Sequence, residues 1–228
     1  MSLSFGPILD PRVNAVIERL EGARGRRGDG TPRGEGGSRG GGGGGGGYHR
    51  NRDRDPHAFV NQGFSIHREQ GELIYLLCRM QRATRVVEFA TSVGMSTLFF
   101  AAAMRDNGGG KVIGAELVPQ KVAIARQNLA EAGLADYAEI REGDARETLR
   151  DLGGPVDFAL MDGWPKAEAP SLAREVMAIV APQLRIGGIV MNDNGEDDYL
   201  DFIRDPANGY RSMSLPLKNN TELSVKVA

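Results

Sequence analysis

Apolar and polar positions follow a regular order from residue 85 onward. Short apolar runs that suit buried strands are separated by longer segments in which apolar residues recur at helical spacing. Because strand–helix–strand units join parallel strands, this order predicts an α/β fold with a doubly wound, mostly parallel sheet covered on both faces. The predicted strands are 85–89, 111–116, 138–141, 156–161 and 188–192, and the helices between them are 96–105, 120–132, 145–152 and 171–184.

The chain ends on a different pattern. The runs 210–215 and 221–227 flank the polar turn Lys218-Asn219-Asn220, an arrangement that is typical of an antiparallel hairpin. Added to the five parallel strands, this C-terminal hairpin completes a predicted sheet of seven strands.

Three segments precede the first strand. Asp10 and Pro11 suit the start of a helix whose apolar pattern stops at Gly22. Glycine then dominates the sequence and ends in eight successive glycines, so ordering this stretch costs backbone entropy without apolar compensation. Ser65 is predicted to cap a second helix. The chain is therefore divided into an N-terminal helix at 1–22, a flexible Gly/Arg-rich segment at 23–56 and a main domain at 57–228.

Composition narrows the class of protein. With 228 residues, of which 40% are hydrophobic, the chain can bury one substantial core, and its net charge of −2 gives no general attraction to nucleic acid. The opening residues lack a signal-peptide pattern, and no stretch is long enough to span a bilayer. Cys78, the single cysteine, lies among apolar residues and suits a reducing compartment. We expect a soluble, cytoplasmic protein.

Polar side chains stand where the predicted strands end. In open α/β sheets ligands bind beyond the carboxyl ends of the strands, so these side chains are expected to share one site. They are Glu88, Glu116, Asp144, Asp162 and the pair Asp193-Asn194.

The turn after the first strand is typical of a cofactor seat, because an apolar run ends in an acid and small residues then open a helix. A dinucleotide fold normally has three spaced glycines here, whereas this turn has only Gly94, with Ala90 and Ser92 at the other positions. A cofactor without phosphates is therefore favoured. Glu116 lies where nucleotide sites place an acid for ribose hydroxyls, although a solvated strand-end glutamate would explain that residue alone.

The stretch from Arg85 to Asn194, with the terminal hairpin, resembles the class I S-adenosylmethionine-dependent O-methyltransferases of the catechol and caffeoyl-CoA type. This resemblance implies a Rossmann-like methyltransferase fold and S-adenosyl-L-methionine as cofactor. It also implies that Glu88 holds the methionine end of the cofactor together with the small turn, that Glu116 binds the ribose, and that Asp144 and Ala145 border the adenine. The turn residues concerned are Ala90, Ser92, Gly94 and Ser96.

One departure lies in that turn. Where the family usually has glycine, this chain has Ala90, whose methyl group narrows the backbone approach and restricts positive φ.

A magnesium site is predicted from Asp162, Asp193 and Asn194. Two carboxylates and one amide oxygen form a hard, oxygen-only set that suits Mg²⁺ or another divalent cation, and the resemblance implies the same three ligands. For each residue taken alone, capping of a helix or turn is the better explanation. Their joint placement after two successive strands favours the metal, which would stabilise a phenolate in line with the sulfonium methyl.

The segment Asp162-Gly163-Trp164-Pro165-Lys166 resembles the family's acid-His-Trp-Lys run. Glycine replaces the histidine, and the lysine stands one place further along. Lys166 is the candidate general base and Asp162 the second catalytic residue, although a surface lysine is the ordinary alternative. Asp162 and Trp164 are also expected beside the cofactor; packing in the core is the alternative for Trp164. Residues 64–71 occupy the place of a lid.

The predicted function is methyl transfer from S-adenosylmethionine to a hydroxyl, phenolic or catechol-like, of a small molecule with a divalent metal. A metal-independent enzyme with a side-chain base is the first alternative, and nucleic-acid binding through arginines of the glycine tract is a less favoured one, diluted by Asp29 and Glu35. A homodimer is expected through the aliphatic face of the N-terminal helix. That face comprises Val13, Val16, Ile17 and Leu20, and the arginines are Arg24, Arg26, Arg27, Arg33 and Arg39.

Overall fold

The computed structural model describes residues 6–24, 55–60, 63–164, 166, 169–193, 195–218 and 220–228. Most of the predicted flexible segment 23–56 lies outside these residues, as do the arginines of the glycine tract from Arg26 to Arg39. Within the described part of the chain, no helix combines the length and the apolar character needed to cross a membrane.

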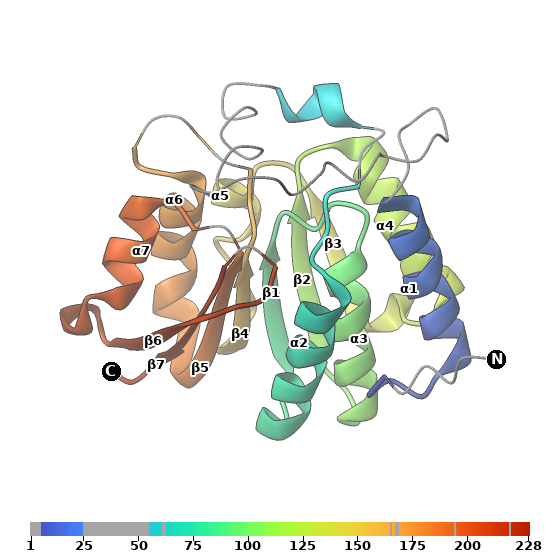
Figure 1. Ribbon diagram of the computed structural model, residues 1–228, viewed down its shortest axis with the longest axis horizontal. Coiled ribbons are helices and arrows are strands. Elements are labelled where there is room, and N and C mark those ends of the chain that lie inside the picture. Colours follow the sequence, from blue (N-terminus) through green and yellow to red (C-terminus); the bar gives the residue numbers. More distant parts are fainter. Residues whose placement is uncertain are drawn as a thin grey trace, which may run out of the picture.

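A single sheet forms the centre of the described structure (Figure 1). Its strands are β1 (Arg85–Phe89), β2 (Lys111–Glu116), β3 (Ala138–Glu142), β4 (Val156–Met161), β5 (Leu184–Asp193), β6 (Tyr210–Leu215) and β7 (Thr221–Lys226). The spatial order is β3-β2-β1-β4-β5-β7-β6. Strands β1 to β5 are parallel, whereas β7 runs antiparallel to both of its neighbours. The predicted doubly wound seven-stranded sheet with a C-terminal hairpin is confirmed.

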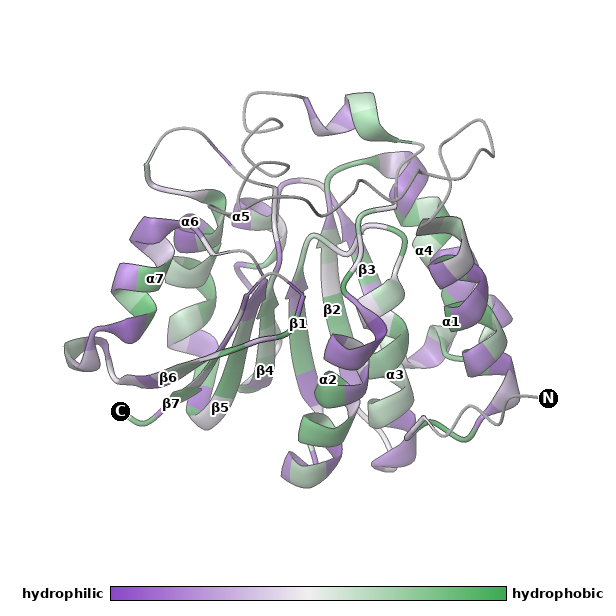
Figure 2. Ribbon diagram, in the orientation of Figure 1, coloured by the Kyte–Doolittle hydropathy of each residue, from purple (hydrophilic) through white to green (hydrophobic). Residues whose placement is uncertain are grey.

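Helices cover both faces of this sheet (Figure 1). One face carries α1 (Pro11–Arg24), α2 (Arg68–Gln81), α3 (Met95–Asp106) and α4 (Pro119–Glu131), and the other carries α5 (Ala145–Thr148), α6 (Leu172–Val180) and α7 (Asp197–Arg204). Short 3-10 turns occur at η2 (Pro56–Phe59), η3 (Ala135–Tyr137), η4 (Ala181–Gln183) and η5 (Pro206–Asn208). In Figure 2 the helices are apolar toward the sheet and hydrophilic on their outer sides.

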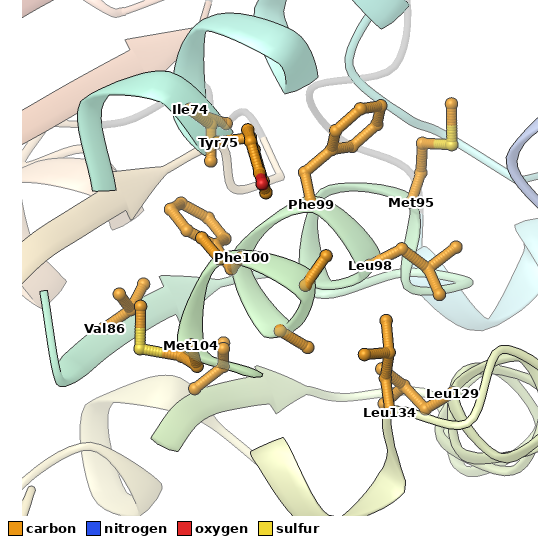
Figure 3. Close-up of a cluster of buried hydrophobic side chains, with 14 of the residues drawn as sticks. Ile74, Tyr75, Val86, Met95, Leu98, Phe99, Phe100, Met104, Leu129 and Leu134 are labelled. Carbon is orange, nitrogen blue, oxygen red and sulfur yellow. The ribbon is translucent and has the colours of Figure 1, made fainter. Parts of the chain in front are cut away.

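The larger apolar cluster is built around α3, which packs against both α2 and the sheet (Figure 3). Phe99 and Phe100 are fully buried, and each such side chain stabilises the fold by about 2–3 kcal/mol through removal from water. Gly71 of α2 lets the two helices approach closely, because a Cβ atom there would lie 2.3 Å from the Phe99 ring. This packing fixes α3, and with it the turn that opens α3 at the sheet edge.

The apolar face of α1 is buried within this same core, against α3 and α4. Val13 and Ile17 have no exposed surface, and Val16 and Leu20 are exposed by only 5% and 8%. The prediction that these four residues pair with a second subunit is therefore wrong, because the chain covers them itself. The homodimer remains a prediction and needs another surface.

Several predicted boundaries are corrected by local chemistry. Helix α2 has His67, and not Ser65, as its N-cap, because Gln70 Oε1 accepts the His67 N–H at 2.8 Å. The predicted helix 171–184 ends at Val180, since Pro182 cannot continue the hydrogen-bond ladder. Helix α5 stops four residues before the predicted end of 145–152, and β5 begins four residues before the predicted 188–192.

Candidate cofactor and acceptor site

The predicted site residues follow neighbouring strands at one edge of the sheet, the upper edge in Figure 1, where η2 also lies. Parallel register pairs Phe89 of β1 with Met161 of β4, and Met161 with Asn192 of β5. The next residues along these chains, Ala90, Asp162 and Asp193, therefore stand side by side at the carboxyl ends of the three strands. The expectation of one shared edge is supported by this register.

The first turn has an unusual backbone. Ala90, Ser92 and Gly94 have φ values of 67°, 51° and 88°, all in the left-handed region. For a residue other than glycine, the left-handed backbone conformation is less stable than the right-handed one by roughly 1–2 kcal/mol. The methyl group of Ala90 restricts positive φ, as the sequence indicates, yet the turn holds Ala90 there. Gly94 also permits close packing, since a Cβ atom would lie 3.3 Å from the Ala125 methyl group on α4.

Glu88 holds this turn through hydrogen bonds to side chains of the turn and of the first turn of α3. It is fully buried on β1 and accepts hydrogen bonds from the hydroxyls of Thr97 at 2.6 Å, Thr91 at 3.0 Å and Ser96. Burial raises the pKa of Glu88, and the three hydroxyl donors partly oppose that shift. Gly114 of β2 makes the Thr91 bond possible, because a Cβ atom there would lie 2.2 Å from Thr91 Oγ1.

Glu116 holds the same turn from the side. Its carboxylate accepts the backbone N–H of Ser92 at 2.7 Å and that of Val118 at 2.9 Å, and only 7% of the residue is exposed. An ionised carboxylate offers about four acceptor positions, so two remain for a ligand hydroxyl. The end of β2 and the turn after β1 thus form one unit.

A cluster of three aromatic side chains, which the sequence analysis missed, lies near this edge of the sheet. The ring centroid of Phe59 on η2 is 5.1 Å from that of Trp164, and the ring of Phe64 is 5.5 Å from Trp164. The ammonium group of Lys121, itself 4% exposed, lies 5.1 Å from the Phe64 ring centroid. Burial lowers the pKa of Lys121, whereas the charge of Glu116 raises it. Trp164 therefore packs against two aromatic rings; its contact with a cofactor remains a prediction, as does lid motion of 64–71.

Asp144 caps α5 and is partnered by a cation. It accepts the Arg146 N–H at 2.8 Å and pairs with the Arg146 guanidinium at 2.6 Å. The hydrogen bond from Arg146 is the main cause that lowers the pKa of Asp144, against the opposing effect of burial. Ala145 is buried at the first position of the helix. The adenine-bordering role of both residues stays a prediction.

Asp193 is also partnered by a cation. It is the last residue of β5, and only 3% of it is exposed. Gln70 on α2 donates an amide N–H to Oδ1 at 3.1 Å, and the Lys218 ammonium forms an ion pair with Oδ2. Asp193 stands opposite Thr221 in the antiparallel register of β5 and β7, so the hairpin turn that carries Lys218 lies at the site edge. This pairing of distant strands places Lys218 beside Asp193, and the local sequence pattern carries no signal for it.

The remaining predicted metal and catalytic residues are less fully defined. Asp162 is half-buried after β4 and has a polar partner, and Asn194 lies outside the described residues. Lys166 Nζ lies 4.0 Å from Glu175 Oε2 on α6. Gly163 replaces the family's histidine where a Cβ atom would lie 1.8 Å from the Phe89 ring. No group of three His, Cys, Asp or Glu side chains suited to a metal ion occurs within the described ranges.

The comparison with protein families matches residues 87–195 to a family described as a methyltransferase domain. The strand order agrees with this match, because a parallel sheet that ends in an antiparallel hairpin is the Rossmann-like methyltransferase fold. A catechol O-methyltransferase of Mycobacterium tuberculosis is 32% identical over 141 residues, which cover 59% of this chain and 63% of that protein. A catechol O-methyltransferase of Niastella koreensis is 32% identical over 143 residues, which cover 58% and 64%.

The chain is thus similar to O-methyltransferases of the catechol type, in agreement with the resemblance of its sequence motifs. It spans a little under two thirds of the length of these curated relatives.

Solved structures with the same fold include two O-methyltransferases. One, from Bacillus cereus in complex with SAH, has a TM-score of 0.59 and 22% identity, and covers 71% of this chain and 82% of that chain. The other, TomG from Streptomyces achromogenes in complex with SAM, has a TM-score of 0.57 and 22% identity, covering 72% and 82%. At this level of identity the likeness concerns the fold.

Proposed function

We propose that this protein is an S-adenosylmethionine-dependent O-methyltransferase that acts on a hydroxyl, phenolic or catechol-like, of a small molecule. The observation that carries the proposal is the left-handed turn after β1, which Glu88 and Glu116 hold through hydroxyl and backbone N–H donors. The names of the curated relatives support the acceptor class.

The chemistry of the turn fits this cofactor. Two acids at its base favour a cationic ligand with hydroxyl and ammonium groups, and they would repel a pyrophosphate. The Ser92 hydroxyl is buried and has no hydrogen-bond partner among the described residues, so it is available to a ligand. Glu116 would accept from the ribose hydroxyls, Ser96 and the turn backbone would hold the methionine end, and Asp144, Ala145 and Trp164 would line the adenine side.

When bound, S-adenosylmethionine supplies an electrophilic methyl group on a sulfonium, which becomes a neutral thioether after transfer. The protein's task is then to align the acceptor oxygen and accept its proton, and alignment alone contributes a large part of such rate enhancements. Asp162, beside the end of β5, is the proposed positioning group. Lys166 remains the proposed base, and Lys166→Met is expected to lower kcat more than it raises KM.

The end of β5 around Asp193, with Asp162 beside it, is called the acceptor edge below. Magnesium does not fit the acceptor edge in the described structure. Both Asp193 oxygens already accept hydrogen bonds, one of them from an ammonium group that would repel a second cation. We therefore assign no step to a divalent ion. The Lys218–Asp193 ion pair favours the alternative of a metal-independent enzyme, in which a side-chain base serves the acceptor.

The proposal is tested by calorimetric titration of S-adenosylmethionine and its demethylated product into the protein. We expect binding at one site, weakened about 10- to 100-fold by Glu116→Gln, because the amide cannot accept from both backbone N–H groups and a ribose hydroxyl. Glu139→Gln, at an exposed position of β3, is the matched control and should bind as the wild type does. No binding of either compound, with or without magnesium, would overturn the proposal.

A further inference from the structure

The inference concerns the cation of the acceptor edge, and it rests on the proposed function. Asp193 is more deeply buried than Asp162, the other predicted ligand among the described residues, and its side chain has no exposed surface in the ion pair with Lys218. The Lys218 side chain is itself only 14% exposed. A carboxylate and an ammonium that are withdrawn from water in this way are fixed partners, unlike a solvated surface pair.

The lysine is presented by an anchored turn. Lys218 adopts a left-handed φ of 54°, and the Thr221 hydroxyl closes the turn by donating to the Leu217 carbonyl at 3.2 Å. The same hydroxyl accepts the Gln70 amide at 2.8 Å, and that amide also donates to Asp193. The carboxylate of Asp193 on β5 is therefore contacted from two sides. Helix α2 contributes the Gln70 amide, and the β6–β7 hairpin contributes the Lys218 ammonium group.

We propose that the Lys218 ammonium takes the place of a divalent cation at this edge. It balances the charge of Asp193 and supplies the positive charge that faces the acceptor oxygen, while it keeps its proton throughout the reaction. A divalent ion on the same carboxylate would have to displace the ammonium and the Gln70 amide, and it would be repelled by Lys218 wherever that group remained nearby. The protein consequently binds its acceptor without magnesium.

A purely structural ion pair that pins the hairpin is the competing explanation, and cation binding distinguishes the two. Mn²⁺ serves as the probe, measured by calorimetry with the demethylated cofactor product present. The wild type is expected to show no saturable Mn²⁺ binding at the sheet edge. Lys218→Met uncovers Asp193, so this variant should show saturable Mn²⁺ binding, about tenfold or more above the detection limit that the wild type does not reach, because ligand charge sets the affinity of such oxygen sites. The gain should disappear in Lys218→Met with Asp193→Asn.

Lys111→Met is the matched control, since Lys111 bonds the Asp136 carbonyl at the opposite end of β2. It should behave as the wild type does. Lys218→Gln, which keeps a hydrogen-bond donor, replaces Lys218→Met if the latter fails to fold. Equal Mn²⁺ binding by wild type and Lys218 variants overturns the proposal, as does the absence of binding in all of them. Failure of the proposed function appears separately, as loss of binding of the cofactor product by the wild type.

Discussion

The two halves of the sheet edge place acids at the ends of strands but surround them differently. At β1 and β2, the carboxylates of Glu88 and Glu116 accept from neutral hydroxyls and backbone N–H groups. Among the described residues neither acid forms an ion pair, although the charge of Lys121 acts on Glu116 without a direct bond. At β5, Asp193 is bonded to the ammonium group of Lys218. Neutral donors leave the negative charge of an acid in place, whereas a cation cancels it. The half of the edge at β1 and β2 is therefore suited to a cationic cofactor. In the half at β5, the charge of Asp193 is already neutralised by Lys218.

The largest expected effect comes from removing the acid of the neutralised half. Asp193→Ala leaves the largely buried Lys218 ammonium and the Gln70 amide without their acceptor, and should lower the free energy of unfolding by about 2–3 kcal/mol. Adding Lys218→Met should restore part of that loss, because the unpaired charge is gone. Urea denaturation measures both. Asp136→Ala, at an exposed position, should change stability by less than about 0.5 kcal/mol. A double variant less stable than Asp193→Ala would contradict this account.

A smaller effect is expected from crowding the cofactor half. Gly114→Ala places a methyl group against Thr91 Oγ1 and should break the Thr91–Glu88 hydrogen bond, with a loss of about 1–3 kcal/mol. Thermal unfolding measures the loss, and calorimetry should show weaker binding of S-adenosylmethionine. Gly22→Ala is the control, because nothing lies within 4 Å of its added Cβ and helix α1 should gain about 0.5–1 kcal/mol. If Gly114→Ala keeps full stability and affinity, the hydroxyl bonds to Glu88 do not hold the turn.

The smallest effect tests the backbone of the first turn. Ala90→Gly relieves the left-handed φ and should raise the free energy of unfolding by about 1 kcal/mol. The same change in a helical backbone, Ala130→Gly on α4, should lower it by about 0.5–1 kcal/mol. Urea denaturation of both variants measures the change in the free energy of unfolding, which should be positive for Ala90→Gly and negative for Ala130→Gly. Loss of stability in Ala90→Gly would mean that Ala90 contributes packing that outweighs its strain.

The sequence predicted the parts of the site that depend on local pattern. Glu88 and Glu116 were found because each ends an apolar run, and the parallel order of those runs fixes which edge the two acids share. The small-residue turn was likewise visible, including the constraint at Ala90. These features need only the period of the strands and the known handedness of their connections.

The parts that the sequence did not predict depend on contacts between distant segments. Asp193 meets Lys218 only because β7 pairs with β5 in one register, and Gln70 joins them from α2. The burial of the apolar face of α1 likewise depends on α3 and α4 lying beneath it, so a free dimer face and a covered face have the same helical period. Asn194 and the glycine tract lie outside the described residues, so the predictions for them stand as predictions.

The difference between the two halves is tested most directly by methyl transfer from S-adenosylmethionine to a catechol, measured for the wild type in a chelator and again with added magnesium. The account predicts transfer at the same rate in both conditions, because Lys218 supplies the cation of the acceptor edge. Transfer that stops in the chelator and returns with magnesium would contradict it, and so would the absence of transfer in both.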